Sequence, residues 1–292
     1  MPLPKISIVT PSFNSIHTIR ETIESVQQQN YPHLEHLVID GGSKDGTVEL
    51  LREYPHLHWV SEKDEGHYHA MNKGIAAATG DVIEILNSDD CLRPGALSIV
   101  GQAFSEHPDW DGVFGDLIFV DGQNREIFRR EEAIYDYDVM RFTGVCYVIH
   151  PTLFVRKSVH DKFGVYDHKR FLNTCDFAFE LELGRAGCRI GHVNALLINY
   201  RYHEFGQSAD RRVTDNMDRE KKIILREHGA PGGVHGKVLR AAYRIKRQLQ
   251  KLRYRGKCDL VPGTWHLRKH MQQRTSFTSN IPQEKFSAGL TK

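Results

Sequence analysis

The feature that most restricts the fold of this chain is a regular alternation of short apolar runs with segments of helical periodicity over its first 120 residues. Residues 5–10 have the composition of a strand, and Ile16, Ile19, Ile23 and Val26 then recur at three- and four-residue spacing, as on one face of a helix. Further strands are predicted at 34–39, 57–61 and 81–86, and further helices at 47–53, 68–79 and 94–105, the last with Pro94 in its first turn. Such alternation with short connections predicts an α/β fold, in which a mostly parallel central sheet carries helices on both faces.

The alternation loosens beyond residue 111, and the charge of the chain changes sign further along. We predict strands at 112–120 and 195–202 and helices at 177–185, 215–228 and 237–255, with no periodicity after about residue 274. Residues 1–210 have a net charge of −12, whereas residues 211–292 carry 20 Lys+Arg against 6 Asp+Glu, a net charge of +14. We therefore predict a first domain over residues 1–210 and a basic helical C-terminal extension with a loose tail over residues 211–292.

The composition excludes several classes of protein. With 40% hydrophobic residues the chain can bury a sizeable core, so it is not predicted to be disordered. No run of about 18 apolar residues is present, so we expect no transmembrane helix. The first apolar stretch is too short for a signal peptide. Five cysteines without a Cys-Xaa-Xaa-Cys pair argue against a disulfide framework or a cysteine zinc site, and they fit a cytoplasmic protein.

Polar residues follow three of the predicted strands. The clusters are Thr10-Pro11-Ser12-Phe13-Asn14, the segment 40–47 (Asp-Gly-Gly-Ser-Lys-Asp-Gly-Thr) and Asn87-Ser88-Asp89-Asp90. In an open parallel sheet, ligands bind beyond the carboxyl ends of the strands. Each of the first two clusters alone also fits a turn that caps the next helix. Three clusters that converge on one edge of the sheet predict a ligand site.

The pair Asp89 and Asp90 follows the apolar run 82–86. Two adjacent carboxylates are unfavourable there without a cation, because each loses solvation and repels the other. Oxygen ligands without thiols suit Mg²⁺ or Mn²⁺, which typically also bind a substrate diphosphate. A simple surface turn is the alternative interpretation of this pair.

Four segments in order carry a resemblance to a known family. They are Thr10–Asn14, Asp40–Thr47, Ala70–Ile75 (Ala-Met-Asn-Lys-Gly-Ile) and Leu86–Asp90. In this order and spacing they resemble family-2 glycosyltransferases with the GT-A fold, and the likeness covers about residues 4–210. The resemblance implies an inverting transfer of a sugar from a nucleotide-diphosphate donor, with Mn²⁺ or Mg²⁺ as cofactor. It also makes residues 1–210 the catalytic domain.

The resemblance implies roles for individual residues in donor binding. Thr10, Pro11 and Ser12 would line the nucleotide pocket, and Asp40 would accept a hydrogen bond from the base, most often uracil. Glu62, Asp64 and Lys73 fall where the family approaches the nucleotide and the donor sugar. The other donor-binding positions within the motifs are Asn14, Gly41, Asn87 and Ser88.

The metal ligand implied by the resemblance is Asp89, from the family's Asp-Xaa-Asp motif. The first aspartate of that motif is replaced here by Asn87, so ligation would rest on Asp89 and Asp90. Residues 202–208 resemble the family's closing loop, which makes His203 a third candidate ligand, although Gln207 replaces a usual glycine.

The candidate catalytic base is Asp176, because residues 174–181 resemble the family segment that supplies it. Without the resemblance, Asp176 would be interpreted as an acid that caps the N-terminus of a helix. His67 and His69 alternate as metal ligands can, but two residues apart in a helix do not share a face.

Residues 237–257 contain nine Lys+Arg and no acidic residue. Apolar residues at 238, 242, 245, 249 and 252 repeat at four- and three-residue intervals and form one stripe on a helix. A basic amphipathic helix is typical of elements that bind an anionic membrane surface. The first alternative is a solvated helix that packs on the catalytic domain by this stripe. The second is nucleic-acid contact, which sparse aromatic residues and the acidic domain disfavour, so we expect no nucleic-acid partner.

We therefore predict an inverting glycosyltransferase of the hexosyl or N-acetylhexosaminyl type, with a UDP-sugar as the expected donor. Its acceptor would be a glycan or a lipid-linked molecule at the inner face of the cytoplasmic membrane. A nucleotidyltransferase is an alternative, but it would normally carry a Gly-rich basic loop after the first strand, where this chain has residues 11–14 (Pro-Ser-Phe-Asn). The alternative from another class is a non-catalytic sugar-nucleotide sensor or membrane adaptor, against which Asp89, Asp90 and Asp176 argue.

Overall fold

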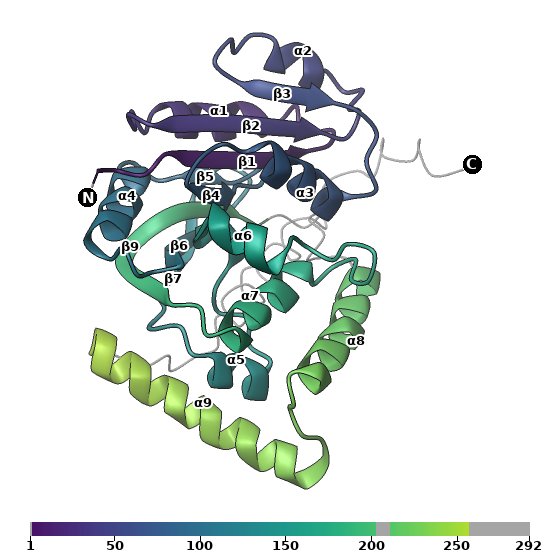
Figure 1. Ribbon diagram of the computed structural model, residues 1–292. Helices are drawn as coiled ribbons and strands as arrows, with labels where there is room; N and C mark the ends of the chain where they lie inside the picture. The colour runs from purple at the N-terminus through teal and green to yellow at the C-terminus, as the bar shows by residue number, and fades with distance from the viewer. Residues whose placement is uncertain (1, 203–210, 257–292) are drawn as a thin grey trace, which may run out of the picture. The chain divides into compact units, whose positions relative to one another are not determined.

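Four parallel strands form the first half of the central sheet (Figure 1). They are β1 (Ile6–Ser12), β2 (Leu34–Asp40), β3 (His58–Ser61) and β4 (Val82–Ile85), and they lie in the order β3-β2-β1-β4. The computed structural model describes residues 2–202 and 211–256, which belong to one compact unit. The predicted α/β class is confirmed, and each of these strands begins and ends within two residues of its prediction.

Helices cover both faces of this half of the sheet. They are α1 (Ile19–Gln27), α2 (Thr47–Leu51), α3 (His67–Ala77) and α4 (Ala96–Glu106). α1 and α2 enclose Val38 of β2 on one face, whereas α3 packs against Ile39 of β2 and Val9 of β1 on the other. Gly74 permits this close approach, since a Cβ at that position would lie 2.2 Å from Cγ1 of Val9.

α4 begins later than the sequence predicts. Pro94 lies before the helix, and Gly95 at the N-cap has a φ of 79°, the left-handed conformation that favours glycine. The expectation that Pro94 occupies the first turn is therefore wrong, because Pro94 lies in the turn before the helix and precedes the N-cap residue Gly95.

The second half of the sheet is mixed. Its strands are β5 (Cys91–Leu92), β6 (Gly112–Val120), β7 (Glu126–Arg130), β8 (Leu153–Arg156) and β9 (Ile190–Arg201). β8 runs antiparallel to both β4 and β6, while β9 runs parallel to β6. The described residues thus form a nine-stranded sheet in the order β3-β2-β1-β4-β8-β6-β9-β5, with β7 beside β6.

Short helices connect the strands of this half. They are α5 (Tyr137–Thr143), the 3₁₀ helix η1 (His150–Thr152), α6 (Lys157–Phe163) and α7 (Cys175–Arg185). α7 confirms the helix predicted at 177–185, and Asp176 lies in its first turn. η1 contacts β4 of the parallel half as well as β6 and β9.

Two further helices, α8 (Arg211–Glu227) and α9 (Gly233–Arg255), form the predicted C-terminal helical region. α9 lies beside α5 (Figure 1) and contacts the sheet through charged side chains: Arg247 and Lys251 pair with Glu132, and Arg255 pairs with Asp116.

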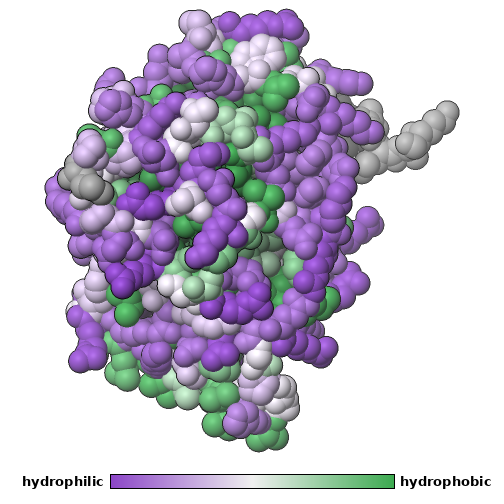
Figure 2. Space-filling model, in the orientation of Figure 1, coloured by the Kyte–Doolittle hydropathy of each residue, from purple (hydrophilic) through white to green (hydrophobic). Residues whose placement is uncertain are grey.

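The apolar stripe of α9 is exposed, so the alternative in which this stripe packs on the catalytic domain is wrong. Hydrophobic side chains accordingly lie along the lower edge of Figure 2, where Figure 1 places α9. Among the described helices, none combines the length and apolarity needed to cross a bilayer.

Candidate active site

A cavity of about 830 Å³ opens at the carboxyl ends of β1, β2 and β4. Residues 11–15, Gly41 and residues 87–89, which follow these three strands, form one wall. The rest includes Asp64 and the start of α3, His150 of η1, the start of α7, the end of β9 and part of α8. The three polar clusters that the sequence places at strand ends therefore meet in one cavity.

The structure brings most of the sequence-predicted site residues into the wall of this cavity. Those in the wall are Pro11, Ser12, Asn14, Gly41, Asp64, Asn87, Ser88, Asp89 and Asp176. The predicted residues that lie elsewhere are Thr10, Asp40, Glu62, Lys73 and Asp90. His203 lies outside the described residues.

Asp40 organises the loop that follows β2. Its Oδ2 accepts hydrogen bonds from the amides of Gly42 (3.0 Å) and Ser43 (2.9 Å) and from the hydroxyl of Ser61 (2.6 Å), and its Oδ1 accepts one from Ser43 Oγ (2.5 Å). The carboxylate is fully buried by these contacts, so it shapes the loop instead of facing the cavity as the sequence suggested. Gly41 takes that position, where a Cβ would lie 2.8 Å from Oδ2 of Asp64.

Three other predicted donor residues also point elsewhere. The side chain of Thr10 is buried, because alternate residues of a strand face opposite sides of the sheet. Its Oγ1 lies 3.0 Å from Nε2 of His36. Glu62 and Lys73 form an ion pair at 2.7 Å. Their charges therefore satisfy each other beside the cavity, not within its wall.

Asp89 and Asp90 have different surroundings although they are adjacent. Asp89 lies in the cavity wall. Asp90 is buried, its Oδ1 accepts a hydrogen bond from the amide of Arg201 (2.8 Å), and its Oδ2 accepts one from Nδ2 of Asn87 (2.9 Å). The guanidinium of Arg201 donates to the carbonyl oxygen of Asp89 (2.9 Å). The buried Asp90 and Arg201 thus hold the turn that presents Asp89 to the cavity.

Asp176 lines the same cavity from the start of α7, and two neighbours position it. The hydroxyl of Tyr68 donates to Oδ1 of Asp176 at 2.8 Å, and Nδ1 of His150 lies 3.9 Å from Oδ2. Burial, with the charge of Asp176 adding to it, raises the pKa of Tyr68 well above its ordinary value, so the hydroxyl stays protonated and can donate. Burial lowers the pKa of His150, although Asp176 and Asp89 oppose this, so its imidazole is neutral at pH 7.

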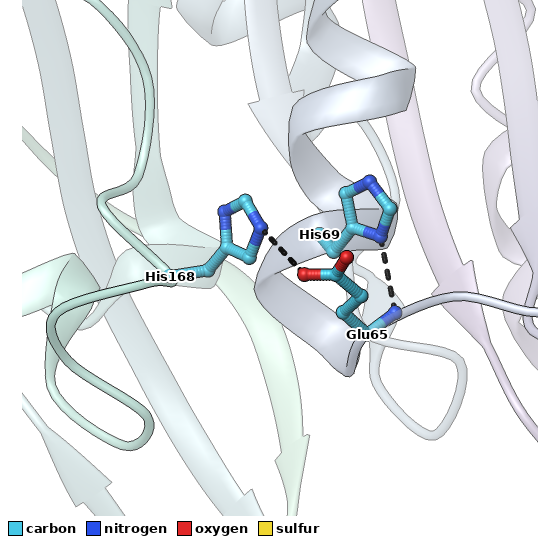
Figure 3. A group of neighbouring side chains, drawn as sticks. All are labelled: Glu65, His69 and His168. Atoms are coloured by element: carbon cyan, nitrogen blue, oxygen red, sulfur yellow. Dashed lines mark hydrogen bonds and ion pairs between the residues drawn. The ribbon is translucent and has the colours of Figure 1, made fainter.

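The two histidines of α3 point in different directions, as their spacing predicts. His67 lines the cavity, and burial lowers its pKa to about 4. His69 lies outside, stacked on His168 with ring centroids 5.0 Å apart and close to Glu65 (Figure 3). Histidine and glutamate are the residue types that bind transition metals, and one potential ligand atom from each lies within 4.8 Å of the others.

The contacts of this group are hydrogen bonds and ion pairs. Nδ1 of His69 accepts the amide hydrogen of Glu65 at 3.0 Å, and the carboxylate of Glu65 pairs with the ammonium of Lys169 and lies 3.5 Å from Nε2 of His168. The group therefore ties the start of α3 to the segment that leads into α7.

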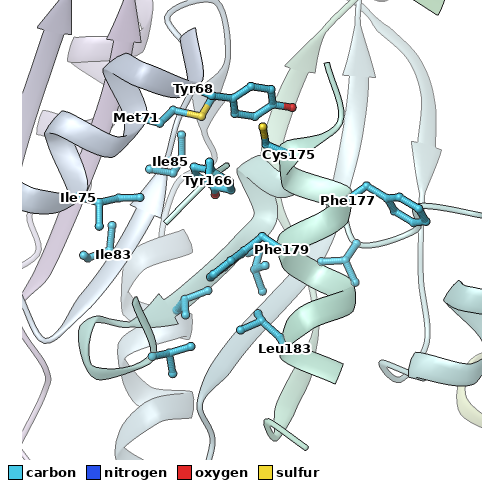
Figure 4. Packing of buried hydrophobic residues seen from close by; sticks show 14 of the residues in the cluster. Tyr68, Met71, Ile75, Ile83, Ile85, Tyr166, Cys175, Phe177, Phe179 and Leu183 are labelled. Atoms are coloured by element: carbon cyan, nitrogen blue, oxygen red, sulfur yellow. The ribbon is translucent and has the colours of Figure 1, made fainter. Parts of the chain in front are cut away.

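α3 and α7, which carry Tyr68 and Asp176, share one buried cluster (Figure 4). The ring of Tyr166 bridges them, with centroids 5.5 Å from Tyr68 and 5.4 Å from Phe179. Met71 of α3 completes the packing on its side (Figure 4). A close-packed core of this kind fixes the separation of the two helix starts, and with it the contact between Tyr68 and Asp176.

Comparison with protein families identifies the chain at this point. The model of the family described as "Glycosyl transferase family 2" matches residues 7–164, which include β1, β2, β4 and the turn that presents Asp89. The chain belongs to glycosyl transferase family 2. Asp176 lies beyond the matched segment, so its position rests on the geometry of the cavity.

Relatives in this family are similar over part of their length. An uncharacterized glycosyltransferase of Mycobacterium tuberculosis is 36% identical over 169 residues, which make up 56% of this chain and 63% of that protein. A PGL/p-HBAD biosynthesis glycosyltransferase of Mycobacterium bovis is 30% identical over 187 residues, 61% of this chain and 69% of that protein. The match to the first relative thus spans less than two thirds of its length.

A solved structure shares the fold. The crystal structure of S. aureus TarS in complex with UDP-GlcNAc superposes with a TM-score of 0.59 at 17% sequence identity, and the match covers 82% of this chain and 79% of that one. At this identity the likeness is one of fold, and it supports a GT-A architecture for this member of family 2.

Several residues of this family-2 site are not found by sequence reasoning. Tyr68, His150 and Arg201 carry no motif of their own, and each reaches the site through tertiary packing. One signal is present in the sequence: Arg201 lies one residue before the end of the predicted strand 195–202, and a cation near a strand end is a candidate partner for a carboxylate pair.

Proposed function

We propose that this protein transfers a sugar from a UDP-sugar to a hydroxyl of a glycan or lipid-linked acceptor, with inversion at the anomeric carbon. The observation that carries the proposal is the placement of Asp89 and Asp176 in one cavity with the loops that follow β1, β2 and β4. Strand-end loops of an open sheet are where nucleotides bind. A second carboxylate, which comes from a separate segment of the chain at the start of α7, can act on the acceptor.

Asp176 is the proposed general base. Its carboxylate takes the proton of the acceptor hydroxyl while that oxygen forms a bond to the anomeric carbon and the bond from that carbon to the diphosphate oxygen breaks. Nucleophile and leaving group lie on opposite sides of the carbon, so one displacement inverts it. Tyr68 holds Oδ1 of Asp176, which leaves Oδ2 for the acceptor on the side of His150.

Asp89 is the proposed ligand of a divalent cation, Mn²⁺ or Mg²⁺. The residues fit such an ion, since Asp89, Asp64 and Asn87 offer oxygen donors in the cavity wall, and no cysteine lines it among the described residues. When bound, the ion would neutralise the charge that develops on the diphosphate. Asp90 is not needed as a ligand, because its oxygens bind Asn87 and Arg201.

The donor and acceptor classes rest on the relatives. TarS, which shares the fold, was crystallised with UDP-GlcNAc. The Mycobacterium bovis relative is named for PGL/p-HBAD biosynthesis, and a Bacillus subtilis relative is a putative teichuronic acid biosynthesis glycosyltransferase. These names favour a uridine nucleotide and a cell-envelope acceptor for this chain.

A thermal-unfolding panel of nucleoside diphosphates with and without Mn²⁺ tests the proposal. We expect a rise in melting temperature that is selective for UDP and depends on the metal, since a ligand at 100 times its Kd stabilises the folded state by about 2.7 kcal/mol. Release of UDP from UDP-glucose, UDP-galactose and UDP-GlcNAc, measured in parallel, would identify the sugar. A panel without any nucleotide-dependent shift would contradict the proposal, and binding without UDP release from any donor would favour a non-catalytic nucleotide-binding protein.

A further inference from the structure

α9 presents its two faces in an unusual way. Charged and aromatic side chains pack on the domain: Lys251 is buried against Glu132, and the ring of Tyr243 contacts that of Phe142 with centroids 4.7 Å apart. The large apolar side chains point outward and are between 47% and 77% exposed; they are Val234, Val238, Ile245, Leu249 and Leu252. A helix that only packs on its own domain buries its apolar face. The apolar face of α9 is therefore available to something else.

Cationic side chains border this apolar face on both edges. Lys237 and Arg244 each precede a residue of the stripe and lie along one edge, while Arg253 follows Leu252 and lies along the other. All three are exposed. The surface thus combines an apolar strip with positive charge on both of its edges, which is complementary to the acyl chains and anionic headgroups of a bilayer.

We propose that α9 lies flat on a membrane that contains anionic phospholipids, with its apolar stripe inserted at the level of the headgroups and its basic edges on the phosphates. Lys251, Arg247 and Arg255 keep the opposite face of the helix on the domain through Glu132 and Asp116. α8, whose Val213 and Met217 line the donor cavity, leads directly into α9. The same pair of helices therefore connects the cavity to the surface that would meet the membrane.

Co-sedimentation of the full chain with vesicles tests this proposal without any need for catalytic activity. Vesicles of phosphatidylcholine with phosphatidylglycerol should pellet the protein, and vesicles of phosphatidylcholine alone should pellet much less. The double variant Ile245→Asn/Leu249→Asn should lower the partition coefficient roughly tenfold, because binding scales with the apolar area inserted. Arg244→Gln/Arg253→Gln should weaken binding to anionic vesicles and reduce its salt dependence.

The matched control is Leu3→Asn/Ile99→Asn, which makes the same chemical change at two exposed apolar residues away from α9. It should bind vesicles as the wild type does, and equal melting temperatures would show that every variant is folded. Absence of binding by the wild type would overturn the proposal, as would equal loss in the control. Light scattering would detect a dimer in solution. If the wild type forms a dimer but does not bind vesicles, and the Ile245→Asn/Leu249→Asn variant is monomeric, the apolar face of α9 binds a second copy of the chain instead of a membrane.

Discussion

Tyr68 donates the one hydrogen bond that joins α3 to the carboxylate of Asp176 in the described structure. Hydrogen bonds to a charged group contribute about 1.5–3 kcal/mol. Tyr68→Phe should therefore lower kcat roughly tenfold or more, since the carboxylate loses its orientation, while the Kd for UDP stays unchanged. Steady-state kinetics together with UDP titration would separate these two quantities.

The control for Tyr68→Phe is Tyr31→Phe, which removes another buried phenol whose hydroxyl donates to the carbonyl oxygen of Pro4 (2.8 Å) far from the cavity. It should lower stability and leave kcat unchanged. If Tyr68→Phe instead weakened UDP binding with an unchanged kcat, the positioning role would be wrong.

Substitution of Asp89 and substitution of Asp176 should have different effects on the affinity for UDP. Asp89→Ala and Asp176→Asn should each abolish transfer, because one removes the proposed metal ligand and the other the proposed base. Asp176→Asn should keep wild-type affinity for UDP with Mn²⁺, whereas Asp89→Ala should weaken it. Isothermal titration and an assay of UDP release measure the two effects, and an active Asp176→Asn protein would eliminate Asp176 as the base.

At this scale the sequence predicts the residues that stand at strand ends and misses those that reach the site across the fold. Asn87, Ser88 and Asp89 follow a strong apolar run, so their place at the sheet edge follows from the pattern. Tyr68 lies 108 residues from its partner Asp176, and only the packing of α3 on α7 joins them. The roles expected for Thr10 and Asp40 depend on side-chain direction, which the buried contacts of each residue decide.

At the scale of single elements, β4 contains a buried acid that the strand pattern does not explain. Glu84 is fully buried, and neither carboxylate oxygen has a hydrogen-bond partner among the described residues. Burial, with the charge of Asp90 adding to it, raises the pKa of Glu84 well above 4.5, so the side chain is held neutral in the folded protein. Folding thus takes up a proton at Glu84 above the unfolded pKa, and the contribution of Glu84 to stability falls as the pH rises above about 4.5.

Glu84→Met, which keeps an unbranched side chain and removes the acid, should relieve this loss. We expect the free energy of unfolding of the variant to exceed that of the wild type by an amount that grows from pH 5 to pH 8, at most by about 1.4 kcal/mol per pH unit. Urea unfolding at three pH values measures it. The exposed Glu49→Met on α2 should show no such pH dependence. A gain that is equal at every pH would mean that the effect of Glu84→Met is packing alone.

The elements that the sequence misses are short. β5 has only two residues, too few for a strand pattern, and β7 and β8, with five and four residues, lie in the stretch where periodicity loosens. β8 could not be placed from pattern alone, because its antiparallel pairing with β4 and β6 depends on how η1 turns the chain. α1 is predicted because Ile19, Ile23 and Val26 recur on one face of the helix, and these residues are buried.

At the scale of the whole molecule, the opposite charges of the two parts of the chain attach α9 to the domain. Acidic side chains of the sheet region hold the basic α9: Glu132 binds Arg247 and Lys251, and Asp136 binds Lys246 at 2.7 Å. The sequence predicted the basic amphipathic helix and left open which face would pack. Burial of long cationic side chains is favourable here only because each finds a carboxylate, and such pairing across more than 100 residues is not encoded in periodicity.

Glu132 should therefore be the residue on which the attachment of α9 depends most. Burial by itself raises the pKa of Glu132, but Arg130, Arg247 and Lys251 more than offset this and hold the pKa below its ordinary value of 4.5. Its contribution to stability is thus present above pH 4.5 and is lost as the pH falls below it.

Glu132→Gln leaves Arg130, Arg247 and Lys251 facing a neutral amide and should lower the free energy of unfolding by about 3 kcal/mol at pH 7. Hydrogen exchange should then accelerate at residues 233–255, whereas Glu126→Gln, which removes an exposed pair with Arg129, should change neither quantity. Unchanged exchange over α9 in the Glu132 variant would show that the aromatic contacts of Tyr243 and Tyr254, and not the charges, hold the helix on the domain.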